Sequence, residues 1–324
     1  MNFIGVRDPE IRFTGRWNVG EKEAVTTAPG AYIELAFGGE EVVLMFDTEL
    51  NRHPYPHLWI MVDNGAAQET AVDRFIRINA PPGRKHYIKI IYKSAVEIQH
   101  RWYEPLEGKI TFLGAQVSAK AELPRDDRKV IEFLGDSITE GVLIDEACRI
   151  HKFDQWNRPY QDDAAATYAY LTAQKLGLRP IICGYGAVGI LQAGCGSVPK
   201  AIDIYPFCYF NMPLPKTKKD YIVMNYGAND SQYSAEQYAY EYKRFIEFVR
   251  NEHPEAKIIV LSAFCGAHVK ELSEMISQYN RETKDHIYFI NAEGWIPKEP
   301  LHPDRCGHMI IAERLAEILK SEIL

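Results

Sequence analysis

Residues 130–141 constrain the fold of this chain more than any other stretch, because a short apolar run leads directly into a helix start. Four of the first five residues are apolar, which is typical of a buried strand. The run ends at Gly135, a residue type that tolerates backbone shapes closed to others. Asp136 and Ser137 follow, and both residue types are favoured at helix starts. The stretch therefore predicts a serine at the carboxyl edge of a sheet, beside the positive end of a helix dipole, where a weak nucleophile gains most.

The chain beyond residue 129 alternates strand-like apolar runs with segments that are apolar at helical spacing. The predicted strands are residues 130–134, 180–183, 221–225, 258–262 and 287–290. The predicted helices are residues 164–176, 235–251, 271–283 and 309–324. This alternation predicts a three-layer α/β domain built on a parallel sheet.

The chain before residue 120 instead has an all-β pattern, with alternating or apolar runs and almost no helical periodicity. The strand candidates are residues 31–37, 42–46, 57–63, 86–93 and 110–117. Turns are predicted at Gly38-Gly39 and at Asn64-Gly65. Many short strands with regular turns predict a β-sandwich, specifically a jelly roll.

The length of 324 residues allows about two domains. Residues 121–128 are mostly charged and include a proline, as is typical of a segment between domains. We therefore expect an N-terminal β-sandwich domain over residues 1–122 and an α/β domain over residues 123–324.

Charge and hydropathy exclude several classes of protein. The net charge is -7 and no long basic run occurs, which argues against a nucleic-acid-binding protein. No stretch approaches the roughly 20 apolar residues that a membrane-spanning helix needs. The N-terminus has charged residues at Arg7 and Asp8 and lacks the apolar core of a secretory signal, so the sequence, taken as complete, predicts a cytoplasmic protein.

The six cysteines form no CxxC pair and are expected to be reduced. The sequence makes no prediction of the oligomeric state.

Chemically useful residues follow the predicted strands of the α/β domain. Ser137 follows the first strand, the glycine-rich residues 184–189 follow the second, Asn229 follows the third, and His302 lies beyond the last. Ligands of open α/β sheets collect beyond the carboxyl ends of the strands, so these groups are expected to converge. A serine, free backbone donors, a side-chain amide and an imidazole are the parts needed for acyl transfer.

These four blocks, in this order, resemble those of the SGNH (GDSL-like) hydrolases, and the resemblance extends from residue 130 to the end of the chain. It implies that Ser137 is the nucleophile and His302 the base. It also implies that the oxyanion is held by the backbone N–H groups of Ser137 and Gly189 and by the side chain of Asn229. Each block is short, but their order and their places at strand ends make the resemblance specific.

The acidic residue before the histidine departs from the family pattern. The family usually has Asp three residues before the histidine, where this chain has Glu299. The longer side chain either reaches the imidazole of His302 or leaves its orientation to a backbone carbonyl. The orienting group matters because it fixes which imidazole nitrogen carries the proton.

The β-sandwich placed before the hydrolase domain resembles the two-domain carbohydrate esterases of family two. This resemblance implies removal of O-acetyl groups from acetylated oligosaccharides, with no cofactor and no metal. Two alternatives stay open: an esterase or thioesterase for other small esters, without a sugar requirement, and a carbohydrate-binding protein that has lost activity. Only the unusual Glu299 favours the second alternative.

Four residues are candidates for contact with the substrate. Trp156, Tyr205 and Trp295 offer flat faces on which a sugar ring can stack, although packing inside the protein explains them equally well. Asp136 adjoins the serine and is expected chiefly to brace its loop.

Two other kinds of site are disfavoured. Residues 184–189 match Gly-x-Gly-x-x-Gly, but Gly194 and Gly196 are poor material for the helix that a dinucleotide site requires. His302 and His308 lie close to a cysteine, but no fourth metal ligand is evident, and His308 is expected to be structural.

Overall fold

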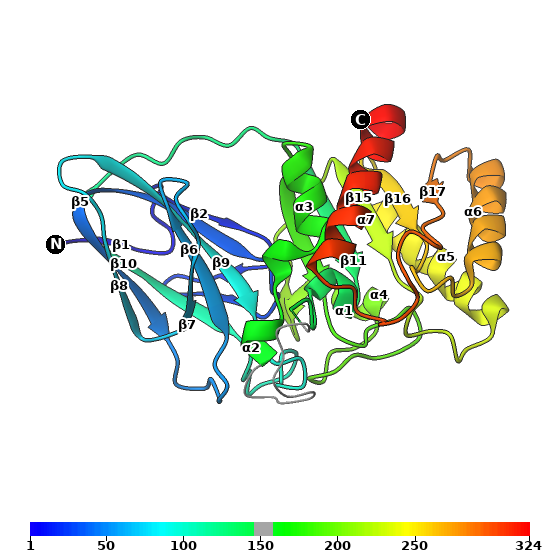
Figure 1. The fold of residues 1–324 in the computed structure, drawn as a ribbon, viewed down its shortest axis with the longest axis horizontal. Helices are drawn as coiled ribbons and strands as arrows, with labels where there is room; N and C mark the ends of the chain where they lie inside the picture. Colours follow the sequence, from blue (N-terminus) through cyan, green and yellow to red (C-terminus); the bar gives the residue numbers. More distant parts are fainter. Residues whose placement is uncertain (146–157) are drawn as a thin grey trace.

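The structure, a computed structural model, describes residues 1–145 and 158–324. Figure 1 shows an antiparallel β region formed by the N-terminal part of the chain, packed beside a layered α/β region formed by the rest. Residues 121–129, which have no regular secondary structure, connect the two. The predicted boundary between residues 122 and 123 falls in this connection, and the division into two domains there stays a prediction.

The N-terminal region is a ten-stranded sheet with the main path β3-β4-β10-β5-β9-β6-β7. The strands are β1 (Asn2–Ile4), β2 (Ile11–Thr14), β3 (Asn18–Val19), β4 (Ala24–Thr26), β5 (Tyr32–Asp47), β6 (His57–Val62), β7 (Gln68–Ala71), β8 (Phe75–Asn79), β9 (Lys85–Ser94) and β10 (Ile110–Lys120). The pairings within this sheet are antiparallel, which agrees with the predicted all-β class. The jelly-roll arrangement stays a prediction.

Strand β5 organises this sheet. Its first half pairs with β2 and β9, and its second half pairs with β8 and most of β10. The turn predicted at Gly38-Gly39 is wrong, because β5 runs through it as one strand. Gly39 has a φ of +96°, and a Cβ there would lie 2.4 Å from the Ser118 Cβ, so the glycine permits close pairing rather than a reversal. The hairpin predicted at Asn64-Gly65 is confirmed by the antiparallel pairing of β6 with β7.

The C-terminal region has a five-stranded parallel sheet in the order β12-β11-β15-β16-β17. Its strands are β11 (Val130–Gly135), β12 (Arg179–Gly184), β15 (Tyr221–Asn225), β16 (Lys257–Leu261) and β17 (Tyr288–Ile290). Its longer helices are α3 (Tyr168–Lys175), α5 (Ala235–Glu252), α6 (Val269–Thr283) and α7 (Arg305–Ile318), and the last is continued by a π-helical turn at Leu319–Ile323. Short elements complete the region: α1 (Ser137–Glu140), α2 (Arg158–Gln161), a 3-10 turn (Ala164–Ala166), α4 (Ala201–Ile204), β13 (Phe207–Tyr209) and β14 (Met212–Pro213).

The predicted three layers are present, with helices on both faces of the parallel sheet (Figure 1). Phe133 and Val223 pack with residues of α3 and α7, whereas Leu134 and Met224 pack with residues of α5 and α6. This alternation follows from the two-residue period of a strand, and it buries both faces, as parallel sheets require. The strand order reverses beside β11, and this switch point is where ligands of such sheets bind.

The two regions share buried cores. Tyr32 and Ile91 of the N-terminal sheet pack in the cluster that contains Ile131, and Trp102 packs in the cluster that contains Leu134. Burying one large apolar side chain contributes roughly 1.5–3 kcal/mol, so these contacts hold the regions firmly together. Among the described residues, no helix has both the length and the apolar character that crossing a membrane demands.

Candidate active site

Ser137 lies at the turn between β11 and α1. Every residue of β11 is buried, and the side chain of Asp136 caps α1 by accepting a hydrogen bond from the Ile138 N–H at 2.9 Å. Gly135 is required here because a Cβ would lie 2.1 Å from the Thr139 Oγ1. The tight turn leaves Ser137 6% exposed at the first position of the helix. A helix N–H at this position has no intrahelical acceptor, so it is available to a ligand.

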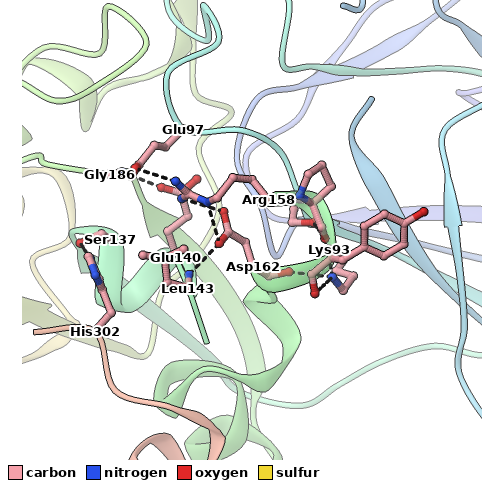
Figure 2. Close-up of polar contacts among 12 residues, drawn as sticks. Lys93, Glu97, Ser137, Glu140, Leu143, Arg158, Asp162, Gly186 and His302 are labelled. Atoms are coloured by element: carbon pink, nitrogen blue, oxygen red, sulfur yellow. Dashed lines mark hydrogen bonds and ion pairs between the residues drawn. The ribbon is translucent and has the colours of Figure 1, made fainter. Parts of the chain in front are cut away.

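His302 comes from the loop between β17 and α7. Its Nε2 lies 2.9 Å from the Ser137 Oγ, across 165 residues of sequence (Figure 2). Asp304 caps α7 by accepting from the Gly307 N–H at 2.8 Å, which fixes the helix directly after the histidine. The distance is that of a hydrogen bond between a nucleophile and its base.

Asn229 and Asp230 lie in the loop after β15. The Asp230 carboxylate accepts from the Ile190 N–H at 2.9 Å and from the Leu191 N–H at 2.9 Å, so it holds the loop after β12. A Cβ at Gly189 would lie 2.4 Å from the Asp230 Oδ1, so this close approach needs glycine. The Asn229 Nδ2 donates to the Val188 carbonyl at 3.1 Å, and a carboxamide nitrogen carries a second hydrogen for another acceptor.

The predicted oxyanion donors differ in their availability. The Gly189 N–H donates to the Gln192 carbonyl at 2.9 Å, so in this conformation it forms a hydrogen bond within its own loop. Among the contacts of the described residues, the Ser137 N–H and the second N–H of Asn229 have no acceptor, so these two predicted donors stay available. The sequence pattern contained no signal for the turn that engages Gly189.

Glu299 is not joined to His302 in the structure. Its side chain is exposed, and it forms no hydrogen bond or ion pair with another described residue. The assignment of Glu299 as the orienting acid therefore stays a prediction.

The four residues predicted to contact the substrate differ in their burial and surroundings. Tyr205 is buried as part of the core, and its hydroxyl donates to the Glu132 Oε2 at 3.2 Å. Asp136 is also buried, and burial raises its pKa to about 7. Trp295 is half-buried against the core beside α7. Trp156 lies outside the described residues.

His308 lies behind the site and has a structural environment. It is fully buried, its Nδ1 accepts from the Tyr168 N–H at 2.9 Å, and the two rings are parallel. Burial, with smaller contributions from the nearby His302 and Arg305, lowers the pKa of His308 to about 3. The imidazole is therefore neutral at pH 7, with its proton on Nε2.

Sequence reasoning missed Glu140, the last residue of α1. Its buried carboxylate accepts from the Gly186 N–H at 2.6 Å (Figure 2) and pairs with Arg101 of the N-terminal region. A charged residue that is buried has no periodic signature, and the only sign of Glu140 was its position three residues after the serine.

Comparison with known sequences gives one family. The sequence profile of the GDSL-like lipase/acylhydrolase family matches residues 133–310, which include Ser137, Asn229 and His302. The sequence matches none of the curated proteins with which it was compared.

Comparison with solved structures gives matches over nearly the whole chain. A family two carbohydrate esterase from Clostridium thermocellum, in complex with cellohexaose, is 21% identical, with a TM-score of 0.80 over 97% of this chain and 99% of that one. A family two carbohydrate esterase from Cellvibrio japonicus is 20% identical, with a TM-score of 0.82 over 98% and 97%. An acetyl xylan esterase from the rumen bacterium Butyrivibrio proteoclasticus is 16% identical, with a TM-score of 0.80 over 100% and 99%. These likenesses show that the arrangement of the N-terminal β region and the α/β region is shared.

Proposed function

We propose that this chain, which belongs to the GDSL-like lipase/acylhydrolase family and is a carboxylic ester hydrolase, removes O-acetyl groups from acetylated oligosaccharides. The observation that carries the proposal is the 2.9 Å contact between the Ser137 Oγ and the His302 Nε2 at the switch point of the sheet. A serine and an imidazole in this relation form the core of a nucleophilic acyl-transfer site.

In the first step, His302 takes the proton of the Ser137 hydroxyl as the Oγ attacks the acetyl carbonyl. The carbonyl oxygen becomes negatively charged and accepts hydrogen bonds from the Ser137 N–H and the Asn229 amide. The Gly189 N–H joins them when it leaves the Gln192 carbonyl. The bond between the carbonyl carbon and the sugar oxygen then breaks, the protonated His302 gives its proton to that oxygen, and the acetyl group stays on the serine.

In the second step, water attacks the acetyl-enzyme. His302 takes a proton from the water, the same donors hold the new oxyanion, and acetate leaves as the proton returns to the Ser137 Oγ. Glu299 enters this scheme only as the predicted orienting acid of His302.

Support for a carbohydrate substrate comes from the fold. The similar structures are described as carbohydrate esterases, and the one from Clostridium thermocellum was solved with cellohexaose. At 16–21% identity these likenesses concern the fold, so the sugar belongs to our proposal.

Acetate release tests the proposal. The purified protein is incubated with acetylated xylo-, manno- and cello-oligosaccharides and, separately, with naphthyl acetate, and kcat/KM is compared. We expect a higher kcat/KM on at least one acetylated oligosaccharide than on naphthyl acetate. We expect no release of acetate by Ser137→Ala. Equal or better cleavage of naphthyl acetate would favour a short-chain esterase without a sugar requirement. Oligosaccharide binding without any ester cleavage would favour an inactive binding protein.

A further inference from the structure

Glu140 connects the helix that begins with Ser137 to two other segments. Its side chain is 3% exposed, one carboxylate oxygen accepts from the Gly186 N–H at 2.6 Å, and both oxygens are contacted by the guanidinium of Arg101. Gly186 lies in the loop that also carries Gly189. One carboxylate therefore fixes the helix of the nucleophile against a loop of the predicted oxyanion hole.

Arg101 supplies the positive charge from the N-terminal region. It follows β9, is 0% exposed, and its guanidinium carbon lies 5.2 Å from the centre of the Tyr185 ring. Its backbone N–H donates to the Gly196 carbonyl at 3.1 Å. Arg101 thus contacts the loop after β12 at Tyr185 and Gly196, and it contacts α1 at Glu140.

A second connection from the same segment reaches the chain that leaves α1 (Figure 2). The Glu97 Oε1 accepts from Arg158 at 3.2 Å, and Arg158 pairs with Asp162 at 3.0 Å. The Asp162 Oδ1 accepts from the Leu143 N–H at 2.6 Å. The buried Lys93 donates to the Asp162 carbonyl at 2.8 Å and so holds the same segment.

We propose that Arg101 and Glu140 are positioning residues of the hydrolase, through which the N-terminal β region sets the orientation of Ser137 and of the loop that carries Gly189. The inference rests on the proposed function of Ser137 and His302. It makes the β region a part of the catalytic scaffold.

The choice of an ion pair at this point supports a positioning role. A buried ion pair adds little net stability compared with apolar residues of the same shape, because both charges lose their hydration. Arginine offers a planar, rigid fork that fixes a carboxylate in one orientation. A nucleophile misplaced by about 1 Å loses on the order of 100-fold in rate, so small gains in orientation matter.

The test measures hydrolysis of 4-nitrophenyl acetate, a small ester without a sugar. We expect Arg101→Met to lower kcat by roughly 10- to 100-fold and to change KM by less than about twofold, because alignment is lost while the site stays open. Arg101→Lys keeps the charge without the fork and should restore part of kcat. Thermal unfolding of each variant shows that the measurement is made on folded protein.

A matched control separates positioning from docking. Arg16 also comes from the N-terminal region, is 1% exposed, and pairs with Glu132 of β11, but among the described residues it forms no hydrogen bond or ion pair with α1 or with residues 185–200. Arg16→Met should keep the kcat of the folded enzyme within about twofold. An equal fall of kcat in Arg16→Met and Arg101→Met would overturn the proposal.

A double variant covers the case in which Arg101→Met does not fold because Glu140 is left charged and unpaired. In Arg101→Met/Glu140→Gln the glutamine still accepts from the Gly186 N–H, and we expect the same loss of kcat. If neither methionine variant folds, Arg101→Lys, the mildest change, becomes the test, and we expect its kcat to fall by about 3- to 10-fold. A kcat within twofold of wild type in whichever folded variant is used as the test would refute the positioning role. An inactive wild-type enzyme would instead reject the proposed function.

Discussion

Two buried arginines of the N-terminal region bind the same strand–helix unit at its opposite ends. Arg16 pairs with Glu132 near the start of β11, and Arg101 pairs with Glu140 at the end of α1. All four side chains are at most 3% exposed. Lys219, also buried, adds a second cation to Glu132 at 3.0 Å.

The surroundings of the two glutamates differ. Burial raises the pKa of Glu132, but Lys219 and Arg16 outweigh it and the net pKa is lowered. Burial also raises the pKa of Glu140, and there Arg101 and the Gly186 N–H oppose it without outweighing it, so the net pKa is raised. Glu132 is therefore compensated by two buried cations, whereas one oxygen of Glu140 accepts a hydrogen bond from the Gly186 N–H.

Burial of an ion pair does not by itself reveal its role. Arg16 donates to the carbonyls of Ile204, Tyr205 and Phe207, none of which belongs to the loops around Ser137. Arg101 donates to the Glu97 carbonyl of its own segment, but its other contacts are with α1 and with the loop after β12. We therefore expect changes at the catalytic end to lower turnover and changes at the Glu132 end to lower stability.

The largest effect is expected at Ser137, the proposed nucleophile. Ser137→Ala should lower kcat by about 10⁴-fold or more, because no other hydroxyl replaces the Oγ that His302 contacts. Ester cleavage is measured alongside circular dichroism. Ser321→Ala removes an exposed hydroxyl from the C-terminal turn and serves as the control. Turnover that survives in Ser137→Ala would show that the chemistry lies elsewhere.

The next effect concerns Asn229, the proposed oxyanion donor after β15. Asn229→Ala should lower kcat by roughly 100- to 1000-fold, the usual loss for one such donor. KM should change little, since the donor acts on charge that appears only in the transition state. Gln232→Ala, an exposed amide of the same loop, is the matched control. Equal, small effects of the two changes would leave Asn229 without a role in catalysis.

The site could be predicted from sequence where topology alone brings residues together. Carboxyl ends of parallel strands share one edge, so blocks that follow the strands must meet there, and the structure places the Ser137 Oγ within 2.9 Å of the His302 Nε2. The strands of the α/β region could also be predicted, because both faces of the sheet are buried and each strand is therefore a continuous apolar run.

Contacts made by loops could not be predicted. Arg101 and Glu140 are 39 residues apart, and no periodicity links an arginine after a strand to a glutamate in a one-turn helix. Several edge strands, such as β3 with two residues, are too short to give a pattern. The continuity of β5 through Gly38-Gly39 escaped prediction because a glycine pair signals a turn unless a neighbouring strand fills the space.

A smaller effect is expected at Glu299. Glu299→Gln should keep kcat within about threefold of wild type, because the carboxylate is exposed and forms no hydrogen bond or ion pair with another described residue. The pH profile of kcat/KM is measured with the same ester. A loss above about 100-fold would show that the side chain reaches His302 during the reaction and acts as the orienting acid.

The smallest effect on turnover is expected at the Glu132 end, where the comparison is sharpest. Glu132→Gln leaves Arg16 and Lys219 buried with less compensation, so the free energy of unfolding should fall by about 3–5 kcal/mol, while kcat of the folded enzyme stays within about twofold. The folded-state pKa of Glu132 is lowered, so its stabilisation is present above its ordinary value of 4.5 and is lost as pH falls below it. The stability difference between wild type and variant should therefore narrow in acid, as urea unfolding at pH 7 and at pH 4 would show. A large loss of kcat in folded Glu132→Gln would mean that both ends of the unit position Ser137, and the distinction between docking and positioning would fail.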